Sequence, residues 1–253
     1  MKLNIVPARQ GLQWVKLGIQ TFAKQPLALA GLFFMYIAAV VVVSMVPVLG
    51  VLIGGVLVPA ATLGLMAASA EATKGKFPMP TVLLSAFRAG RQRGRAMLVL
   101  GVIYTVGSLI ASSLAGLLAP GDPAAPRGQM DNTALIALAL HAPLFLMFWH
   151  APALVHWHGV SPVKSLFFSA VACLRNFGAH LVYGLAWLAV FLGVGSAVGL
   201  IGLLLGGGDV ARAMMMPTAL LMAAMFSTSI YFSFRDSFSE GEEAAAAPDQ
   251  QLS

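Results

Sequence analysis

Residues 27–46 read LALAGLFFMYIAAVVVVSMV, a run of twenty residues without a charged side chain. At about 1.5 Å per residue, a helix of this length crosses a hydrocarbon core of about 30 Å. Because lipid offers the backbone no hydrogen-bond partner, a chain crosses a membrane either as helices or as a closed barrel. The run is continuous rather than alternating, which excludes a barrel strand and predicts a transmembrane helix.

Similar apolar runs recur along the chain. Of its 253 residues, 59% are hydrophobic and only 9% are charged, and the charges cluster between the runs. A soluble fold could not hide this much apolar surface. The composition therefore predicts an all-α polytopic membrane protein. Six transmembrane helices are expected, over residues 27–46, 48–70, 96–119, 133–155, 181–205 and 214–234.

The basic residues predict how these helices are oriented in the membrane. The loops put thirteen of the fifteen Lys and Arg residues on one side of the membrane, and only Arg127 and Arg212 on the other. Lys and Arg in short loops mark the cytoplasmic side. Both termini are therefore expected in the cytoplasm, and the chain is expected to be a multi-pass protein of a bacterial inner membrane. The same bias accounts for the net charge of +6, so nucleic acid is not expected as a partner.

Three cytoplasmic segments each precede a pair of spans. Each is expected to lie as an amphipathic helix in the membrane interface, with Trp14 at the level of the lipid headgroups. The expected apolar faces are Leu12, Val15, Ile19 and Phe22 in residues 9–24, and Val163, Leu166, Phe167, Ala170, Leu174 and Phe177 in residues 161–177; residues 80–95 form a shorter, more basic version.

This layout predicts a threefold internal repeat within a single membrane domain, residues 1–238. A repeat of this kind would favour a site at the interface between the units. The alternative is that an interfacial helix followed by a hairpin is simply a convenient unit for membrane insertion. The expected units are residues 7–73, 78–159 and 160–238, followed by an acidic, disordered cytoplasmic tail over residues 239–253.

Two histidines are the polar candidates inside the membrane. His141 and His150 fall within the fourth predicted span, where an imidazole needs a partner. No acidic residue lies in any predicted span, which argues against a carrier coupled to protons or cations. The nine-residue spacing points the two histidines to different sides of a helix, and no cysteine pair or acidic co-ligand is near. No metal and no cofactor are therefore expected.

Six basic residues are candidates for binding lipid headgroups. Each basic residue near a membrane surface contributes about 1 kcal/mol of attraction to anionic lipid. Fixing the topology is the alternative role, and the two roles are compatible. The six are Lys74, Lys76, Arg88, Arg91, Arg93 and Arg95.

The sequence carries no recognised catalytic pattern. It contains no phosphate-binding loop of the GxxxxGK[ST] type, no GxSxG and no HExxH. It has no soluble domain, and no pair of nucleophile and base stands out. The chain is therefore not expected to be an enzyme.

Three stretches resemble a family of uncharacterised inner-membrane proteins found mainly in beta-proteobacteria. They are HAPALVHWHGVSPVKSLFFSAVACLRN at 150–176, FAKQPLALAG at 22–31 and SIYFSFRDSF at 229–238. The resemblance covers nearly the whole chain apart from the tail, and it implies no activity. The layout is also distantly similar to the membrane domain attached to some glycerophosphodiesterases. The phosphodiesterase domain itself is absent from the sequence, so that activity is not implied.

Two functional hypotheses follow from these patterns. The first is a non-enzymatic inner-membrane protein that binds lipid, or a partner protein in the membrane, through its basic cytoplasmic collar. The second is a small-molecule transporter or channel with a path near the fourth span, supported by His141, His150 and the prolines beside them. The oligomeric state is left open.

Overall fold

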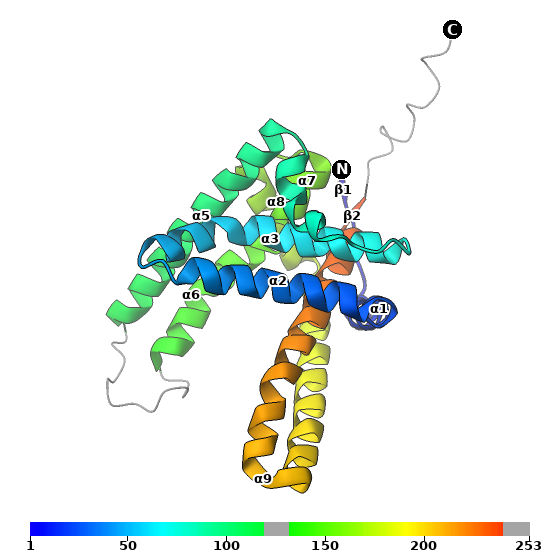
Figure 1. The fold of residues 1–253 in the computed structure, drawn as a ribbon. Helices are drawn as coiled ribbons and strands as arrows, with labels where there is room; N and C mark the ends of the chain where they lie inside the picture. The colour runs from blue at the N-terminus through cyan, green and yellow to red at the C-terminus, as the bar shows by residue number, and fades with distance from the viewer. Residues whose placement is uncertain (119–131, 240–253) are drawn as a thin grey trace. The chain divides into compact units, whose positions relative to one another are not determined.

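The structure is a computed structural model that describes residues 1–118 and 132–239. It is almost entirely helical, as predicted (Figure 1). Five of its helices are long and apolar enough to cross a membrane. The predicted tail beyond residue 239 lies outside the described residues.

The helices follow the predicted runs closely. Two short segments, η1 (Pro80–Leu84) and α4 (Ser85–Arg88), precede the third span, and two short strands, β1 (Lys2–Leu3) and β2 (Phe238–Ser239), lie near the chain ends. The longer helices are α1 (Gln10–Lys24), α2 (Pro26–Ser44), α3 (Leu49–Thr73), α5 (Arg91–Leu118), α6 (Asn132–Phe148), α7 (Ala151–His158), α8 (Pro162–Arg175) and α9 (Phe177–Ser237).

Helix α9 has 61 residues and folds back on itself. Its backbone leaves helical geometry at Gly206 and Gly207, and Gly207 has a φ of +79°, a conformation that glycine adopts without strain. The two arms lie side by side (Figure 1) and pack so closely that a Cβ on Gly202 would overlap Ala211. The arms contain the fifth and sixth predicted spans, although the count of six membrane crossings stays a prediction.

Two predicted helices differ from the structure. The fourth span was expected to be continuous over residues 133–155, but α6 ends at Phe148 and α7 starts at Ala151. The interfacial helix expected over residues 80–95 ends at Arg88, so Arg91, Arg93 and Arg95 belong to the first turns of α5. Gly90, with a φ of +99°, separates α4 from α5.

The chain falls into two compact units, each described by itself. The first comprises Met1–Met35, Leu65–Val82 and the described part of Leu174–Ser253, and the second comprises Tyr36–Gly64 and Leu83–Cys173. The first unit therefore holds α1 and both arms of α9. The second holds α4, α5, α6, α7 and most of α8.

In the first unit, α1 packs against α9 through glycine. A Cβ on Gly11 would overlap the Ala179 carbonyl, and a Cβ on Gly18 would overlap the Ser229 side chain. The buried face of α1 includes Val15 and Phe22 of the predicted apolar stripe but leaves Leu12 exposed, because it is built around these two glycines. Trp14 lies on this face with none of its surface exposed, so its expected place among the headgroups is wrong.

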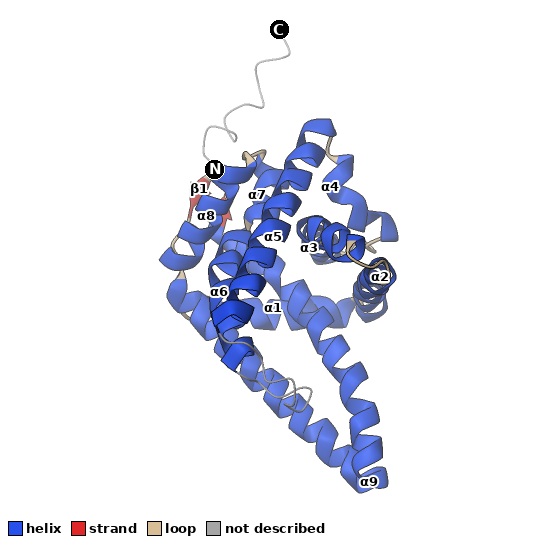
Figure 2. Cartoon of the chain, turned by 90° about the vertical axis from the view of Figure 1, so that its left-hand side faces the viewer, coloured by secondary structure: helices blue, strands red, loops and turns tan. Residues whose placement is uncertain are grey.

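The two ends of the described chain are tied together in this unit. Strands β1 and β2 pair antiparallel, with Lys2 opposite Ser239 (Figure 2). Asn176, at the start of α9, accepts a hydrogen bond from the Val6 N–H at 2.9 Å and donates one to the Asn4 carbonyl at 3.0 Å. The two ends of the described chain therefore lie next to each other, whereas their expected place in the cytoplasm stays a prediction.

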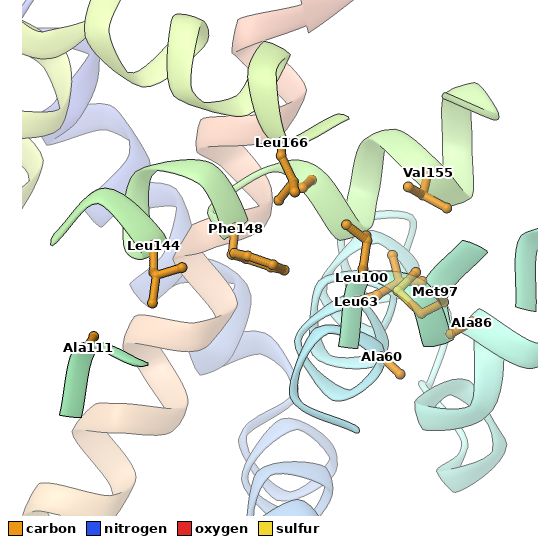
Figure 3. Close-up of a cluster of buried hydrophobic side chains, with 11 residues drawn as sticks. Ala60, Leu63, Ala86, Met97, Leu100, Ala111, Leu144, Phe148, Val155 and Leu166 are labelled. Carbon is orange, nitrogen blue, oxygen red and sulfur yellow. The ribbon is translucent and has the colours of Figure 1, made fainter. Parts of the chain in front are cut away.

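The second unit is held together by an apolar core between its helices. Figure 3 shows the cluster of buried side chains, which come from α3, α4, α5, α6, α7 and α8. Close approach of α3 and α5 again depends on glycine, because a Cβ on Gly101 would overlap the Val56 carbonyl. The core residues are Ala60, Leu63, Ala86, Met97, Leu100, Ala111, Leu144, Phe148, Ala151, Val155 and Leu166.

The interfacial segments of the second unit share one packing rule. Each contacts the spanning helix that immediately precedes it in the sequence. A Cβ on Gly64 of α3 would come 2.7 Å from Leu83 Cα in η1. Ser169 of α8 bonds the backbone of Leu146 and His150, at the break between α6 and α7.

Helix α1 packs against the last predicted span. Gly18 contacts Ser229 on the second arm of α9. The three contact points on the spanning helices, Gly64, His150 and Ser229, stand eight or nine residues before the ends of α3, α7 and α9 at Thr73, His158 and Ser237. This regularity supports the threefold repeat, which stays a prediction.

Adding one methyl group to α1 tests its packing against α9. The Gly18→Ala variant places a Cβ against Ser229. Its free energy of unfolding is expected to fall by about 1–3 kcal/mol, the usual cost of overpacking. The measurement is thermal unfolding in detergent. Gly184→Ala is the matched control, because nothing lies within 4 Å of its added Cβ. Equal melting temperatures for the two variants would contradict this packing.

Candidate functional site

His141 lies near the middle of the fourth apolar segment and links two helices. Its Nδ1 lies 2.7 Å from the Ala137 carbonyl oxygen, one turn earlier in α6. A carbonyl only accepts, so Nδ1 carries a hydrogen. The other ring nitrogen, Nε2, lies 3.1 Å from Ser108 Oγ on α5. The partner that the sequence required for His141 is therefore a serine hydroxyl on the neighbouring helix.

His150 lies at the break between α6 and α7, and none of its surface is exposed. Its backbone N–H donates to Ser169 Oγ at 2.9 Å, and the Ser169 hydroxyl donates to the Leu146 carbonyl at 2.8 Å. The Ser169 side chain of α8 thus bonds a backbone acceptor, the Leu146 carbonyl, and a backbone donor, the His150 N–H, at the break. His141 contacts α5 and His150 contacts α8, so the two predicted residues have separate roles.

The break has a local cause in the sequence. Pro152 has no N–H, so it cannot donate to the Phe148 carbonyl, and it suits the first turn of a new helix, where it lies in α7. Inside a membrane, the backbone groups freed in this way must find protein partners. At this break Ser169 bonds the His150 N–H and the Leu146 carbonyl, two groups that would bond each other in a continuous helix. This makes α8 part of the fourth span's hydrogen bonding.

Cys173 lies one turn after Ser169 and faces the same break. Its Sγ donates a weak hydrogen bond to the Leu146 carbonyl at 3.7 Å, and burial raises the pKa of the thiol to about 12. A ligand atom of His150 lies within 4.8 Å of this sulfur. A metal would need the thiolate and further ligands. The expectation of no metal and no cofactor stays a prediction.

The six basic candidates all have exposed side chains. Lys74 and Lys76 follow the end of α3 in the first unit, and Arg88 ends α4 in the second. The other three arginines stand in the first turns of α5. Within residues 1–118 and 132–239 the ion pairs are Arg212–Asp209 and Arg235–Asp236, so none of the six has a carboxylate partner there.

Helix α8 turns its large apolar side chains outward. Val163, Phe167 and Leu174 are 70%, 64% and 61% exposed, whereas Ser165 and Ser169 are fully buried. A helix in water exposes its polar side chains and buries its apolar ones. Helix α8 does the reverse, as expected of a helix that faces lipid. Lys164 and Arg175, along one edge of this face, are exposed too, whereas Leu166 of the predicted stripe turns into the core.

The chain matches one kind of known protein along nearly all of its length. It is 39% identical to a probable inner membrane protein of Burkholderia thailandensis, over 97% of this chain and 97% of the relative. The chain belongs to this family of inner membrane proteins. The resemblance seen in the sequence is thereby confirmed at that level, and the comparison gives no support to the glycerophosphodiesterase likeness. No family model and no solved structure matches the chain.

One acidic residue of this inner membrane protein was missed by the sequence reasoning. Asp236 lies two residues beyond the sixth predicted span, yet it is still helical, and its side chain is only 15% exposed. Its carboxylate accepts hydrogen bonds from Gln10 Nε2 at 2.7 Å and Trp14 Nε1 at 2.9 Å. Arg235 completes the set through its Nε at 2.9 Å. These contacts anchor α1 to the end of α9.

Removing one hydroxyl tests the role of α8 at the break. The Ser169→Ala variant removes the hydroxyl that bonds the His150 N–H and leaves the Leu146 carbonyl only the weak bond from the Cys173 thiol, and the loss of a buried group's partner costs about 1–3 kcal/mol. A lower melting temperature in detergent is expected. Ser165→Ala is the matched control, because its hydroxyl bonds only the Pro162 carbonyl of its own helix. Similar losses in both variants would refute the role assigned to Ser169.

Proposed function

We propose that this inner membrane protein binds anionic lipid headgroups at the cytoplasmic surface, through the four arginines that flank the start of α5. The observation that carries the proposal is the exposure of Arg88, Arg91, Arg93 and Arg95 without a carboxylate partner in the described part of the chain. The role requires no catalysis, in keeping with the sequence. We call these four residues the arginine surface.

The position of the arginines supports an anionic ligand. The N-terminal end of a helix carries a partial positive charge, so arginines in the first turns of α5 stand where cations are least favoured. No acidic residue occupies that turn to offset them. A lipid phosphate would neutralise the arginines and accept hydrogen bonds from their guanidinium groups.

The outward face of α8 supports the same ligand from another side. Its exposed apolar residues suit acyl chains, and Lys164 and Arg175 suit headgroups at the edge of that layer. Lys74 and Lys76, beyond the end of α3, are candidates for further headgroup contacts.

A transporter has less support as an alternative. Both ring nitrogens of His141 are hydrogen-bonded to protein groups, the Ser108 hydroxyl and the Ala137 carbonyl. At the break in the fourth span, Ser169 bonds the backbone on both sides. Both features bind helices together, which is the commoner use of polar groups in a membrane.

Neutralising the arginine surface tests the proposal. Changing all four arginines to glutamine is expected to weaken binding of phosphatidylglycerol strongly, by up to about 1 kcal/mol per residue, and to leave binding of zwitterionic phosphatidylcholine unchanged. Bound lipid is counted by native mass spectrometry in neutral detergent. Arg212→Gln is the control, because that arginine is exposed and already paired with Asp209. Unchanged phosphatidylglycerol binding in the fourfold variant would sink the proposal.

The proposal also requires that the chain ends and the start of α5 face the cytoplasm. The lone native cysteine is buried, so single cysteines introduced elsewhere report their own accessibility. Gly208→Cys, at the turn of α9, is expected to react with an impermeant maleimide in intact spheroplasts. Lys2→Cys and Ser239→Cys, on the paired strands, should react only after lysis. The opposite labelling would invert the orientation.

A further inference from the structure

Within the second unit, the first turns of α5 meet the end of α7. Gly159 ends α7 in the left-handed conformation, with a φ of +64°, and its N–H bonds the Leu154 carbonyl. Arg93 of α5 lies over this turn, where its Nη2 is 4.0 Å from the place of a Cβ on Gly159. Arg93 is thus a residue of the arginine surface that lies beside the end of α7.

His156, in the last turn of α7, faces the same neighbourhood. The positive charge of Arg93 is close enough to act on its imidazole. Its Nδ1 is buried and has no hydrogen-bond partner among the described residues. Buried polar atoms in proteins almost always have a partner, so an orphan of this kind calls for one that residues 1–118 and 132–239 do not provide.

The two groups share a chemical requirement. A guanidinium donates paired N–H bonds to phosphate oxygens, and a ring N–H of histidine donates one more. A cationic guanidinium beside a ring N–H donor, with no carboxylate bonded to either in the described part of the chain, favours an anion with several acceptor oxygens. Among the charged groups of the described chain, the paired carboxylates Asp209 and Asp236 belong to the first unit and not to this one.

We infer that Arg93 and His156 together form a binding site for the phosphate group of an anionic phospholipid. The inference rests on the proposed function and narrows it, because it assigns one site to the arginine surface. Arg91 and Arg95 then add attraction without direct coupling to His156. Inorganic phosphate has the same chemistry, so the test must separate the two sources.

A double-mutant cycle tests the site. Arg93→Gln and His156→Phe are each expected to weaken phosphatidylglycerol binding about fivefold or more, and the double variant should lose little beyond Arg93→Gln alone, because both act on one ligand. Arg95→Gln is the matched control, and its effect should multiply with that of His156→Phe. His156→Asn keeps a donor at the place of Nδ1 and is expected to retain binding, which separates loss of contact from misfolding.

The outcomes separate this inference from the broader proposal. If the fourfold arginine variant loses binding but Arg93 and His156 act independently, the site is wrong and the arginine surface stands. If the fourfold variant binds normally, both fail. The same titration with inorganic phosphate in place of lipid is expected to show no retained ligand. Retention of free phosphate that depends on Arg93 would overturn the assignment to a lipid.

Discussion

Hydrogen bonding of the backbone inside lipid is the constraint on which this fold depends. Water is absent there, so each break in a helix must be matched by a group from elsewhere in the chain. The break at His150 is matched by Ser169, a residue of a helix that does not itself cross the membrane. The interfacial helix α8 therefore cannot be regarded as an independent surface element. Its buried face serves the backbone of a span, while its outer face remains apolar and open to lipid.

The same constraint explains why several polar residues of this chain stabilise the fold rather than form a functional site. His141 joins α5 and α6 through Ser108, and Asp236 holds α1 through the Trp14 indole and Gln10 amide. In each case a polar group in a sparsely hydrated place has found a partner within its own unit. Ionisable groups that lack such a partner then carry more weight as candidate sites. The arginine surface is of this kind, because its charges are exposed, clustered and uncompensated in the described chain.

Hydrophobic run length and charge placement were enough to predict the fold class and the position of nearly every helix. They missed the features that depend on contacts between distant residues. The continuity of the fourth span depended on whether Pro152 would bend a helix or end it, and the answer lies in α8, more than ten residues away. The buried face of α1 was misjudged because close helix packing in membranes uses Gly11 and Gly18, which carry no hydrophobic signal. The role of His150 was placed in its ring, whereas the described contact to Ser169 is made by its backbone.

The packing rule of the interfacial segments supports the predicted repeat with an observation other than sequence layout. Three elements of different composition meet their spanning helices at nearly the same distance from the helix end, through Gly64, His150 and Ser229. Two of these junctions are made by close approach at a glycine, and only the one at His150 is made by hydrogen bonds. Units that arose by duplication would share the junction made at a glycine, since such a junction needs no more than a small residue. On the predicted repeat, the junction at His150 is the one expected to have diverged, and it lies between α6 and α7, the second of which carries His156 in its last turn. Divergence at one of three equivalent places is where a repeated scaffold would be expected to acquire a specific site.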